Sequence, residues 1–410
     1  MDVLHPCCCG LDVHKRTVVA CLISTPPTGP AEKMIRTFGT MTPDLLALAD
    51  WLTSAGCTHV AMESTGVFWK PIYNILEGLF ELLLVNAQHL KAVPGRKTDV
   101  RDAEWIADLL RHGLLQPSFV PPSPQRDLRD LTRTRTTLVE ERARIVNRIQ
   151  KVLEGANLKL AAVATDITGL SARAMLEALL AGQTNPQALA SLARGKLRVK
   201  HDQLAQALTG HLRPHHAFLL SEHLAHLDFL DEAIVHFSQE IADRMRIETE
   251  AIVLLDTIPG VSQRTAEILL AEIGSDMSRF PSAHHLASWA GICPGNNESA
   301  GKRRSGRTRK GSRWLRQVLI EAAHSAARTK DTYLSAQYHR LAARRGTKKA
   351  LVALGHTILV IVYHVLTRRE PYHELGGNYF DERQRQAVEH RLIRRLELLG
   401  YSVTLQPTVA

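Results

Sequence analysis

The two aspartates Asp99 and Asp102 are three residues apart, a spacing that suits metal binding. They fall in the stretch 97–108, which follows a Pro-Gly break at 94–95 and which we expect to open a helix with Thr98 as N-cap. Residues three apart share a helix face, so the two carboxylates would lie about one turn apart. Like charges this close favour either a bound divalent cation or full hydration. Taken alone, the stretch favours a solvated acidic turn.

Two further acids follow predicted strands in the same part of the chain. We expect strands over 8–13 and 17–23, and Asp12 lies near the end of the first. Another apolar strand, 59–63, ends on Glu63. Predicted strands at 34–38 and 81–85 and helices at 44–54 and 67–79 complete an α/β domain with a mixed sheet. Carboxylates at strand ends and on an adjoining helix can converge on Mg²⁺, which prefers oxygen ligands.

The composition favours a polyanionic partner. The 410 residues carry 51 Lys and Arg against 41 Asp and Glu, a net charge of +10, which indicates nucleic acid most simply. Aromatic residues make up only 5%, so stacking on single-stranded bases is not the dominant signal. The six cysteines have no metal-ligand spacing and fit free thiols in a reducing cytoplasm. No signal peptide is evident, and the apolar run 351–366 is shorter than a membrane span.

Beyond the Pro-rich segment 116–124 the pattern becomes nearly all helical. The stretch 126–152 has an apolar stripe and a basic opposite face, and 220–241 carries a second long stripe. The two could pair as an antiparallel hairpin or as a coiled coil between subunits. Basic residues on the first of these helices are candidates for nucleic-acid binding: Arg129, Arg133 and Arg144.

A second candidate site lies in the C-terminal part. The sequence Ile258-Pro259-Gly260-Val261 before a predicted helix at 265–273 resembles half of a helix-hairpin-helix, although an ordinary turn fits equally well. The stretch 293–316 is rich in turn-forming residues, so we expect a loop, with hydroxyls at Ser299, Ser305 and Ser312. Its cations suit a phosphodiester backbone: Lys302, Arg303, Arg304, Arg307, Arg309, Lys310 and Arg313. The simplest alternative is a flexible basic loop that binds nucleic acid and takes no part in catalysis.

The order of the acids resembles the RNase H/RuvC-like nuclease fold, and the combined segments resemble the DEDD transposases of bacterial insertion sequences. The three matching blocks are 10–15 (GLDVHK), 62–66 (MESTG) and Lys97-Thr98-Asp99-x-x-Asp102-Ala103. The segments 258–260 and 294–311 resemble that family's C-terminal transposase domain. The order and spacing agree over most of residues 7–370.

The resemblance implies a catalytic centre in which four acids hold Mg²⁺ and a serine is the nucleophile. Residue by residue, the acids are Asp12, Glu63, Asp99 and Asp102, and the serine before the small-residue-Gly-Lys step is Ser299. The family often has two adjacent serines here, whereas this chain has Glu298-Ser299, and Ser305 is the competing nucleophile. In that family the serine forms a covalent phosphoserine link to DNA, and a structured bridge RNA pairs with donor and target DNA.

The resemblance also predicts the organisation of the chain. We expect a RuvC-like α/β catalytic domain at 1–122, a helical coiled-coil region for dimerisation at 123–248, a mainly helical transposase domain with the serine loop at 249–375 and a charged tail at 376–410. The predicted function is a cytoplasmic DNA recombinase that acts as a dimer or tetramer on double-stranded DNA with a guide RNA and no membrane. The alternatives are a RuvC-like hydrolytic junction nuclease and a non-catalytic nucleic-acid-binding scaffold.

Overall fold

The computed structural model describes residues 2–26, 29–64, 66–86, 102–294, 297–299, 302–308 and 311–405, with the backbone alone at 297–299 and 302–305. It divides into two compact units, Met1–Pro122 and Ser123–Ala410.

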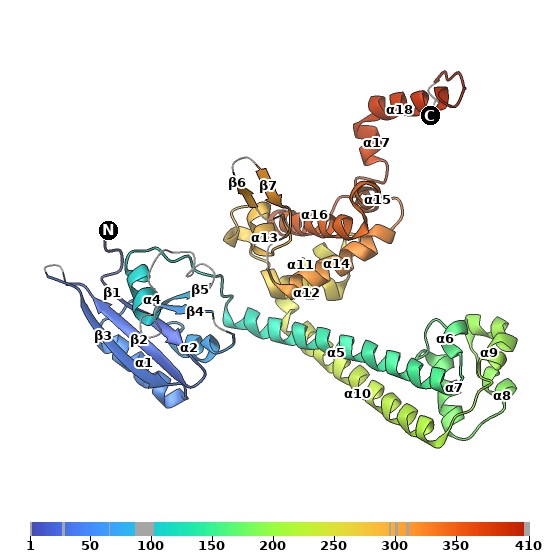
Figure 1. Ribbon diagram of the computed structural model, residues 1–410, viewed down its shortest axis with the longest axis horizontal. Coiled ribbons are helices and arrows are strands. Elements are labelled where there is room, and N and C mark those ends of the chain that lie inside the picture. The colour runs from blue at the N-terminus through green and yellow to red at the C-terminus, as the bar shows by residue number, and fades with distance from the viewer. Residues whose placement is uncertain are drawn as a thin grey trace. The chain divides into compact units, whose positions relative to one another are not determined.

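The N-terminal unit is a five-stranded mixed sheet with helices (Figure 1). The strand order is β3-β2-β1-β4-β5, with β1, β2 and β3 antiparallel and β4 and β5 parallel to β1. The strands are β1 (Cys7–Val13), β2 (Thr17–Ser24), β3 (Glu32–Gly39), β4 (His59–Glu63) and β5 (Glu81–Val85). The helices are α1 (Thr42–Ser54), α2 (Trp69–Leu76) and α4 (Asp102–Arg111). The predicted α/β class with a mixed sheet is confirmed.

Strict alternation along the strands gives the sheet two buried faces. On one face Leu11 and Met62 pack with residues of α1 and α2, such as Leu48 and Ile72. On the other face the buried residues pack against α4: Cys8, Cys21, Ala61 and Val85. Because both faces are covered, nearly all residues of β1 are buried. Its three consecutive cysteines therefore pack as small apolar side chains.

Two long helices dominate the first half of the second unit. Helices α5 (Ser123–Gly155) and α10 (Pro214–Arg244) pack against one another, and Figure 1 shows them side by side. Arg142 pairs with Asp231, Arg135 donates to Ser238, and Arg244 pairs with Asp127, so the helices run antiparallel. The antiparallel hairpin within one chain, one of the two predicted arrangements, is therefore present. Shorter helices close its far end around a separate core: α6 (Leu160–Val163), α7 (Leu170–Leu180), α8 (Pro186–Ala190) and α9 (His201–Ala207).

The second half of this unit is a helical body with its own hydrophobic core. Its helices are α11 (Thr249–Asp256), α12 (Gln263–Ile273), α13 (Ala283–Trp289), α14 (Arg313–Arg328), α15 (Tyr333–Arg345) and α16 (Thr347–Arg368). Helices α17 (Tyr379–Arg383) and α18 (Arg385–Glu397) follow within the predicted charged tail. Helix α16 is long and apolar enough to cross a membrane, but Leu354, Ile358 and Val362 on it are fully buried against the other helices.

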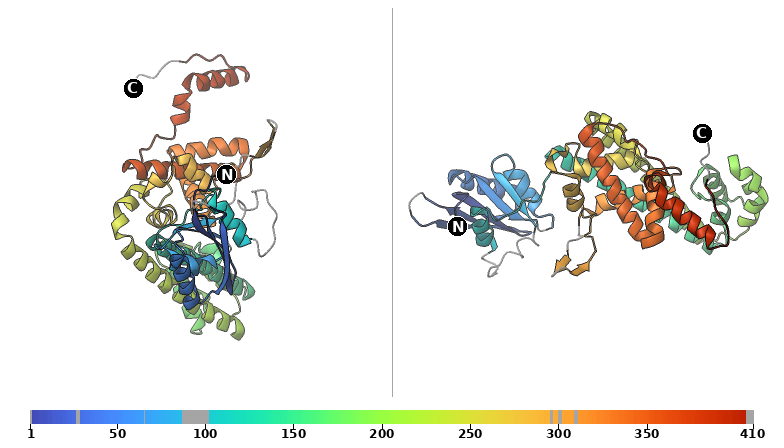
Figure 2. Two further views of the ribbon diagram at one scale, coloured as in Figure 1. Left: turned by 90° about the vertical axis from the view of Figure 1, so that its left-hand side faces the viewer. Right: turned by 90° about the horizontal axis from the view of Figure 1, so that it is seen from above.

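The predicted serine loop contains regular structure, which corrects the sequence-based expectation. Strands β6 (Asn297–Ser299) and β7 (Lys302–Ser305) pair in antiparallel fashion, and in Figure 2 this hairpin extends from the helical body of its unit. The polar composition of 293–316 pointed to a loop because no apolar face marks the strands. A two-stranded hairpin is held by backbone hydrogen bonds, which need no such face.

Candidate active site

Asp12 and Glu63 lie at the same edge of the sheet on neighbouring strands. The parallel pairing of β1 with β4 aligns Leu11 with Met62, so the next residue of each strand is one of the two acids. Both carboxylates therefore lie at the carboxyl ends of adjacent parallel strands, where polar side chains of an open sheet commonly form a site.

The same two acids point to the face of the sheet that α4 covers. Asp12 is two residues beyond Gly10, which contacts α4, and Glu63 is two beyond Ala61, which packs with Ile106 of α4. Residues two apart on a strand share a face. Since α4 begins at Asp102, three of the four predicted acids belong to one face of one unit.

Gly10 fixes the distance between α4 and β1. A Cβ at Gly10 would lie 3.0 Å from the Cα of Ala107 and closer still to the carbonyl of Ala103. Only glycine permits this close backbone approach. The contact anchors the first turn of α4 beside β1 and so determines where Asp102 lies.

His14 holds the carboxylate of Asp12. Its Nε2 lies 3.0 Å from Asp12 Oδ2, and the Asp12 side chain is only 16% exposed. This contact could not be predicted from the sequence, where His14 entered only as part of the block 10–15.

The donor chemistry of the three acids fits Mg²⁺, which prefers carboxylate oxygens. Asp99 lies outside the described residues. Among the residues that are described, no group of three or more potential ligands is close enough to hold a metal ion. The acids thus share a face and an edge of the sheet without forming a closed ligand cluster.

The serine region of the second unit is described only through its backbone. Ser299 ends β6 and pairs with Lys302, and Ser305 ends β7 opposite Asn297. A bridge between Pro294 and Thr308 closes the root of the hairpin. Of the predicted basic residues, Lys302, Arg303 and Arg304 lie on β7, Arg307 follows it in an exposed position, and Arg313 opens α14, whereas Arg309 and Lys310 lie outside the described residues.

The arginines predicted on α5 differ in their surroundings. Arg133 donates to both carboxylate oxygens of Glu272, at 2.7 and 3.0 Å. Arg129 donates to the carbonyl groups of Ala271 and Glu272, and burial lowers its pKa to about 10. Arg144 is 54% exposed beside Glu140 and Glu141. The first two arginines therefore join α5 to α12, and only Arg144 faces solvent.

Glu272 is a residue that the sequence analysis missed. It is 1% exposed, accepts from Arg133, and also accepts from Ser312, the N-cap of α14, at 3.2 Å. It thus links α5 and α12 to the serine stretch at Ser312, directly before α14. A glutamate in an apolar helix gives no sequence signal for such a role unless its partners are known.

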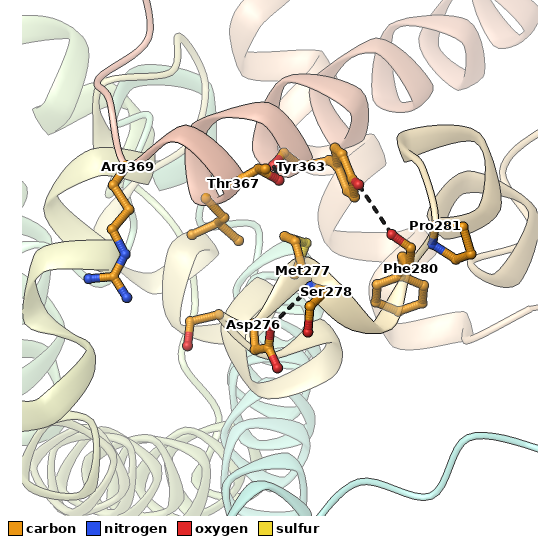
Figure 3. Close-up of a pocket in the computed structure, with 10 residues that line it drawn as sticks. Asp276, Met277, Ser278, Phe280, Pro281, Tyr363, Thr367 and Arg369 are labelled. Carbon is orange, nitrogen blue, oxygen red and sulfur yellow. Dashed lines mark hydrogen bonds between the residues drawn. The ribbon is translucent and has the colours of Figure 1, made fainter.

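A hollow of about 620 Å³ lies at the C-terminal end of α16 (Figure 3). Asp276 accepts there from the amide of Ser278 and Tyr363 donates to the carbonyl of Phe280. Among its lining residues the charged groups are one aspartate and Arg369. This balanced pair lacks the cationic excess that a phosphodiester needs.

Comparison with known proteins gives two family matches. Residues 9–158 match a family model described as a DEDD-type transposase of insertion sequence IS110, and residues 253–339 match the transposase IS116/IS110/IS902 family. The first match contains Asp12, Glu63, Asp99 and Asp102, and the second contains the serine hairpin.

Individual relatives agree with these matches. The chain is 28% identical to the transposase for insertion sequence element IS1111A of Coxiella burnetii, covering 70% of this chain and 72% of that protein. It is 30% identical to the insertion element IS116 uncharacterized 44.8 kDa protein of Streptomyces clavuligerus, covering 60% and 69%. A pilin gene-inverting protein of Moraxella bovis is 33% identical over 29% of this chain and 38% of its own length.

Proposed function

Because the chain belongs to the IS110/IS116/IS902 family of transposases, we propose that it moves an insertion sequence through a covalent serine–DNA intermediate. Its activity as a DNA transposase or recombinase follows from the family. The serine, the metal and the RNA partner are the proposed parts. The observation that carries the proposal is that Asp12, Glu63 and α4 share one edge and one face of the sheet.

The N-terminal unit is proposed to be a RuvC-like catalytic domain. Its mixed sheet, with acids after two adjacent parallel strands and on the helix across that face, supports this interpretation. The other proposed divisions are the helical region 123–248, the transposase domain 249–375 and the tail 376–410. The antiparallel α5–α10 hairpin and the separate helical core after it support them.

Asp12, Glu63, Asp99 and Asp102 would hold Mg²⁺. When bound, the ion neutralises phosphate charge and lowers the pKa of a nearby hydroxyl. The role of His14 in this arrangement is to orient the Asp12 carboxylate through its Nε2 contact. The close approach at Gly10 holds Asp102 on the correct face.

Ser299 is the proposed nucleophile and Ser305 its competitor. The serine oxygen bonds to phosphorus, the bond from phosphorus to the leaving DNA oxygen breaks, and the serine proton passes to that oxygen. Attack by the hydroxyl of another DNA end reverses these changes and releases the serine. The energy of the phosphodiester is kept in the serine ester, so rejoining needs no ATP. Lys302, Arg303 and Arg304 stabilise the charge on the phosphoryl oxygens.

The proposed partners are double-stranded DNA, a guide RNA and further copies of the chain in a dimer or tetramer. The net charge of +10 and the exposed cations Arg144, Arg307 and Arg313 support a nucleic-acid partner.

A denaturing gel that traps protein–DNA adducts tests the nucleophile. Ser299→Ala is expected to abolish the adduct formed with the element ends, and Ser305→Ala is expected to retain it. An undiminished adduct in Ser299→Ala would remove that serine from the role.

A hydrolytic nuclease is the second candidate, because the three described acids belong to a single unit that contains neither serine. It predicts that a Ser299→Ala, Ser305→Ala double variant still cleaves DNA with no adduct. Loss of cleavage in that variant, with cleavage retained in the Ser305→Ala single variant, excludes it.

A further inference from the structure

A cavity of about 640 Å³ lies at the root of the β6–β7 hairpin, within the helical body. Its size falls in the range of about 300–1,000 Å³ typical of small-molecule sites. Pro294 and Thr308, whose bridge closes the hairpin, both line it. Arg316 of α14 donates to Thr308 Oγ1 at 2.9 Å and forms part of the same wall.

Part of the lining of the cavity is strongly cationic. Lys348 and Lys349 line it from the first turn of α16, and Arg307 and Arg316 line it from the hairpin side. No acidic residue is among the lining residues that the structure describes. Two lysines at a helix N-terminus oppose the helix dipole and cost stability. Helix α16 also has no acidic residue in its first turn and no side chain capping it. The negative charge of a bound phosphate would compensate the positive charge of the lysines and of the helix N-terminus.

The rest of the lining, including the next turn of α16, is apolar with a few polar groups. Ile292, Val352 and Ala353 provide the apolar surface. Gln337 donates from Nε2 to Thr357 Oγ1 at 3.1 Å, while its buried Oε1 accepts no hydrogen bond from any residue that the structure describes. After a small rotation of this side chain, an amino group on a bound molecule could donate to that oxygen.

His356 adds a neutral hydrogen-bonding group to this part of the lining. Burial, and secondarily the charge of His284, lowers the pKa of His356, so its ring is neutral at pH 7 and can both donate and accept. Neutral donors and acceptors on an apolar wall are suited to the edge and face of a nucleobase.

We propose that this cavity binds one unstacked nucleotide of the DNA strand on which the hairpin acts, with the phosphate at Lys348 and Lys349 and the base against Val352, Ala353 and Gln337. Enzymes that act on a base inside a duplex extrude its nucleotide into a pocket that reads the base by hydrogen bonds and stacking, and this cavity offers groups of both kinds. A nucleotide held here would fix the strand beside β6 and β7, so this inference rests on the proposed reaction at the hairpin.

Binding of deoxynucleoside monophosphates to the full-length protein, followed by NMR without Mg²⁺ or DNA ends, tests the proposal. Deoxyribose 5-phosphate serves as the ligand that lacks a base. We expect at least one nucleotide to bind about tenfold more tightly than the sugar phosphate, because the base fills the apolar part of the cavity. Lys348→Gln with Lys349→Gln should weaken the binding by about tenfold or more through loss of charge-assisted contacts.

Two matched variants separate this site from general charge effects. Lys196→Gln with Lys330→Gln removes the same charge from exposed positions that do not line the cavity, and its binding should equal that of the unaltered protein. Ala353→Leu narrows the apolar part of the cavity and should reduce nucleotide binding while binding of the sugar phosphate is retained. Thermal melting checks that each variant folds.

Equal binding of nucleotide and sugar phosphate, no detectable binding, or equal weakening by the two lysine pairs would overturn the proposal. A short single-stranded DNA should displace the nucleotide, and an RNA of the same length that displaces it as well or better would overturn the assignment to DNA. The binding measurement requires no catalysis, so failure of the serine chemistry and failure of this pocket give different results.

Discussion

Replacing Gly10 by alanine tests the geometry of the acidic site without altering any acid. The added methyl group would lie 3.0 Å from Ala107 Cα and closer to the Ala103 carbonyl and the Ala107 amide nitrogen. These three neighbours are backbone atoms of α4 and cannot rotate away. Ordinary contact needs about 3.5–4.0 Å, so α4 must retreat from β1 by roughly 1 Å.

This displacement has two measurable consequences. Overpacking of a buried contact costs about 1–3 kcal/mol of unfolding free energy. Asp102 precedes Ala103 directly, so it moves with the helix. A displacement of about 1 Å in a catalytic group can lower the rate by about 100-fold. We therefore expect Gly10→Ala to fold with reduced stability and to form the DNA adduct far more slowly.

Gly155→Ala is the matched control. A Cβ at Gly155 would lie 3.6 Å from His216 Nε2, an ordinary contact, so this substitution should leave both quantities nearly unchanged. Urea unfolding followed by circular dichroism gives the stability, and the rate of adduct formation on element ends gives the activity. If Gly10→Ala matched the control in both measurements, the argument that α4 is held at backbone distance from β1 would be refuted.

Three other predictions concern the charged and thiol groups. Glu272→Gln should lower the unfolding free energy by about 3–5 kcal/mol, because it leaves Arg129 and Arg133 without their buried counter-ion. The control Glu232→Gln, at an exposed position of α10, should change the unfolding free energy little. A small effect of Glu272→Gln in urea unfolding would contradict this prediction. Arg144→Gln should weaken DNA binding without loss of stability and should reduce the slope of log K against log salt concentration by about 1. Arg133→Gln should instead destabilise the fold, and salt titrations and melting curves distinguish the two variants. An unchanged slope for Arg144→Gln would exclude a contact between Arg144 and a phosphate. At pH 8 alkylating reagents should leave Cys8 and Cys57 unmodified, because burial raises the pKa of both thiols to about 12. The half-buried Cys293 should be modified first, and peptide mapping before and after unfolding checks this order. Early modification of Cys8 would contradict its placement under α4.

Much of the N-terminal unit could be predicted because local pattern and tertiary structure agree there. Short apolar strands with turn residues between them marked β1, β2, β4 and β5 nearly to the residue. The strand over 34–38 extends further in the structure, to 32–39, because β3 is an edge strand whose side chains are mostly exposed and carry no apolar signal. The placement of Asp12 and Glu63 after adjacent strands also followed from the pattern.

The roles of the arginines on α5 could not be predicted, because a periodic basic face looks the same whether it meets solvent or a buried acid. Arg133 and Arg144 occupy the same helix, yet one pairs with a carboxylate that is 1% exposed and the other faces water. The difference depends on Glu272, 139 residues away from Arg133 along the chain. Long-range partners of this kind are absent from any local window of the sequence.

The serine stretch shows the same limit in a different form, and it bears on how the hairpin acts. Its small and basic residues predicted only a loop, but the backbone pairs Ser299 with Lys302 and closes at Pro294 and Thr308. Arg316 of α14 donates a hydrogen bond to Thr308, and Glu272 accepts one from Ser312 at the start of the same helix. The C-terminal side of the hairpin is thus attached to the helical body at two residues, and its N-terminal side is joined to the first of them through the Pro294–Thr308 bridge. A group carried on a supported hairpin is positioned more precisely than one on a free loop. The cations of this hairpin would therefore act at a defined place on the phosphodiester, as strand exchange requires, and would do more than attract DNA.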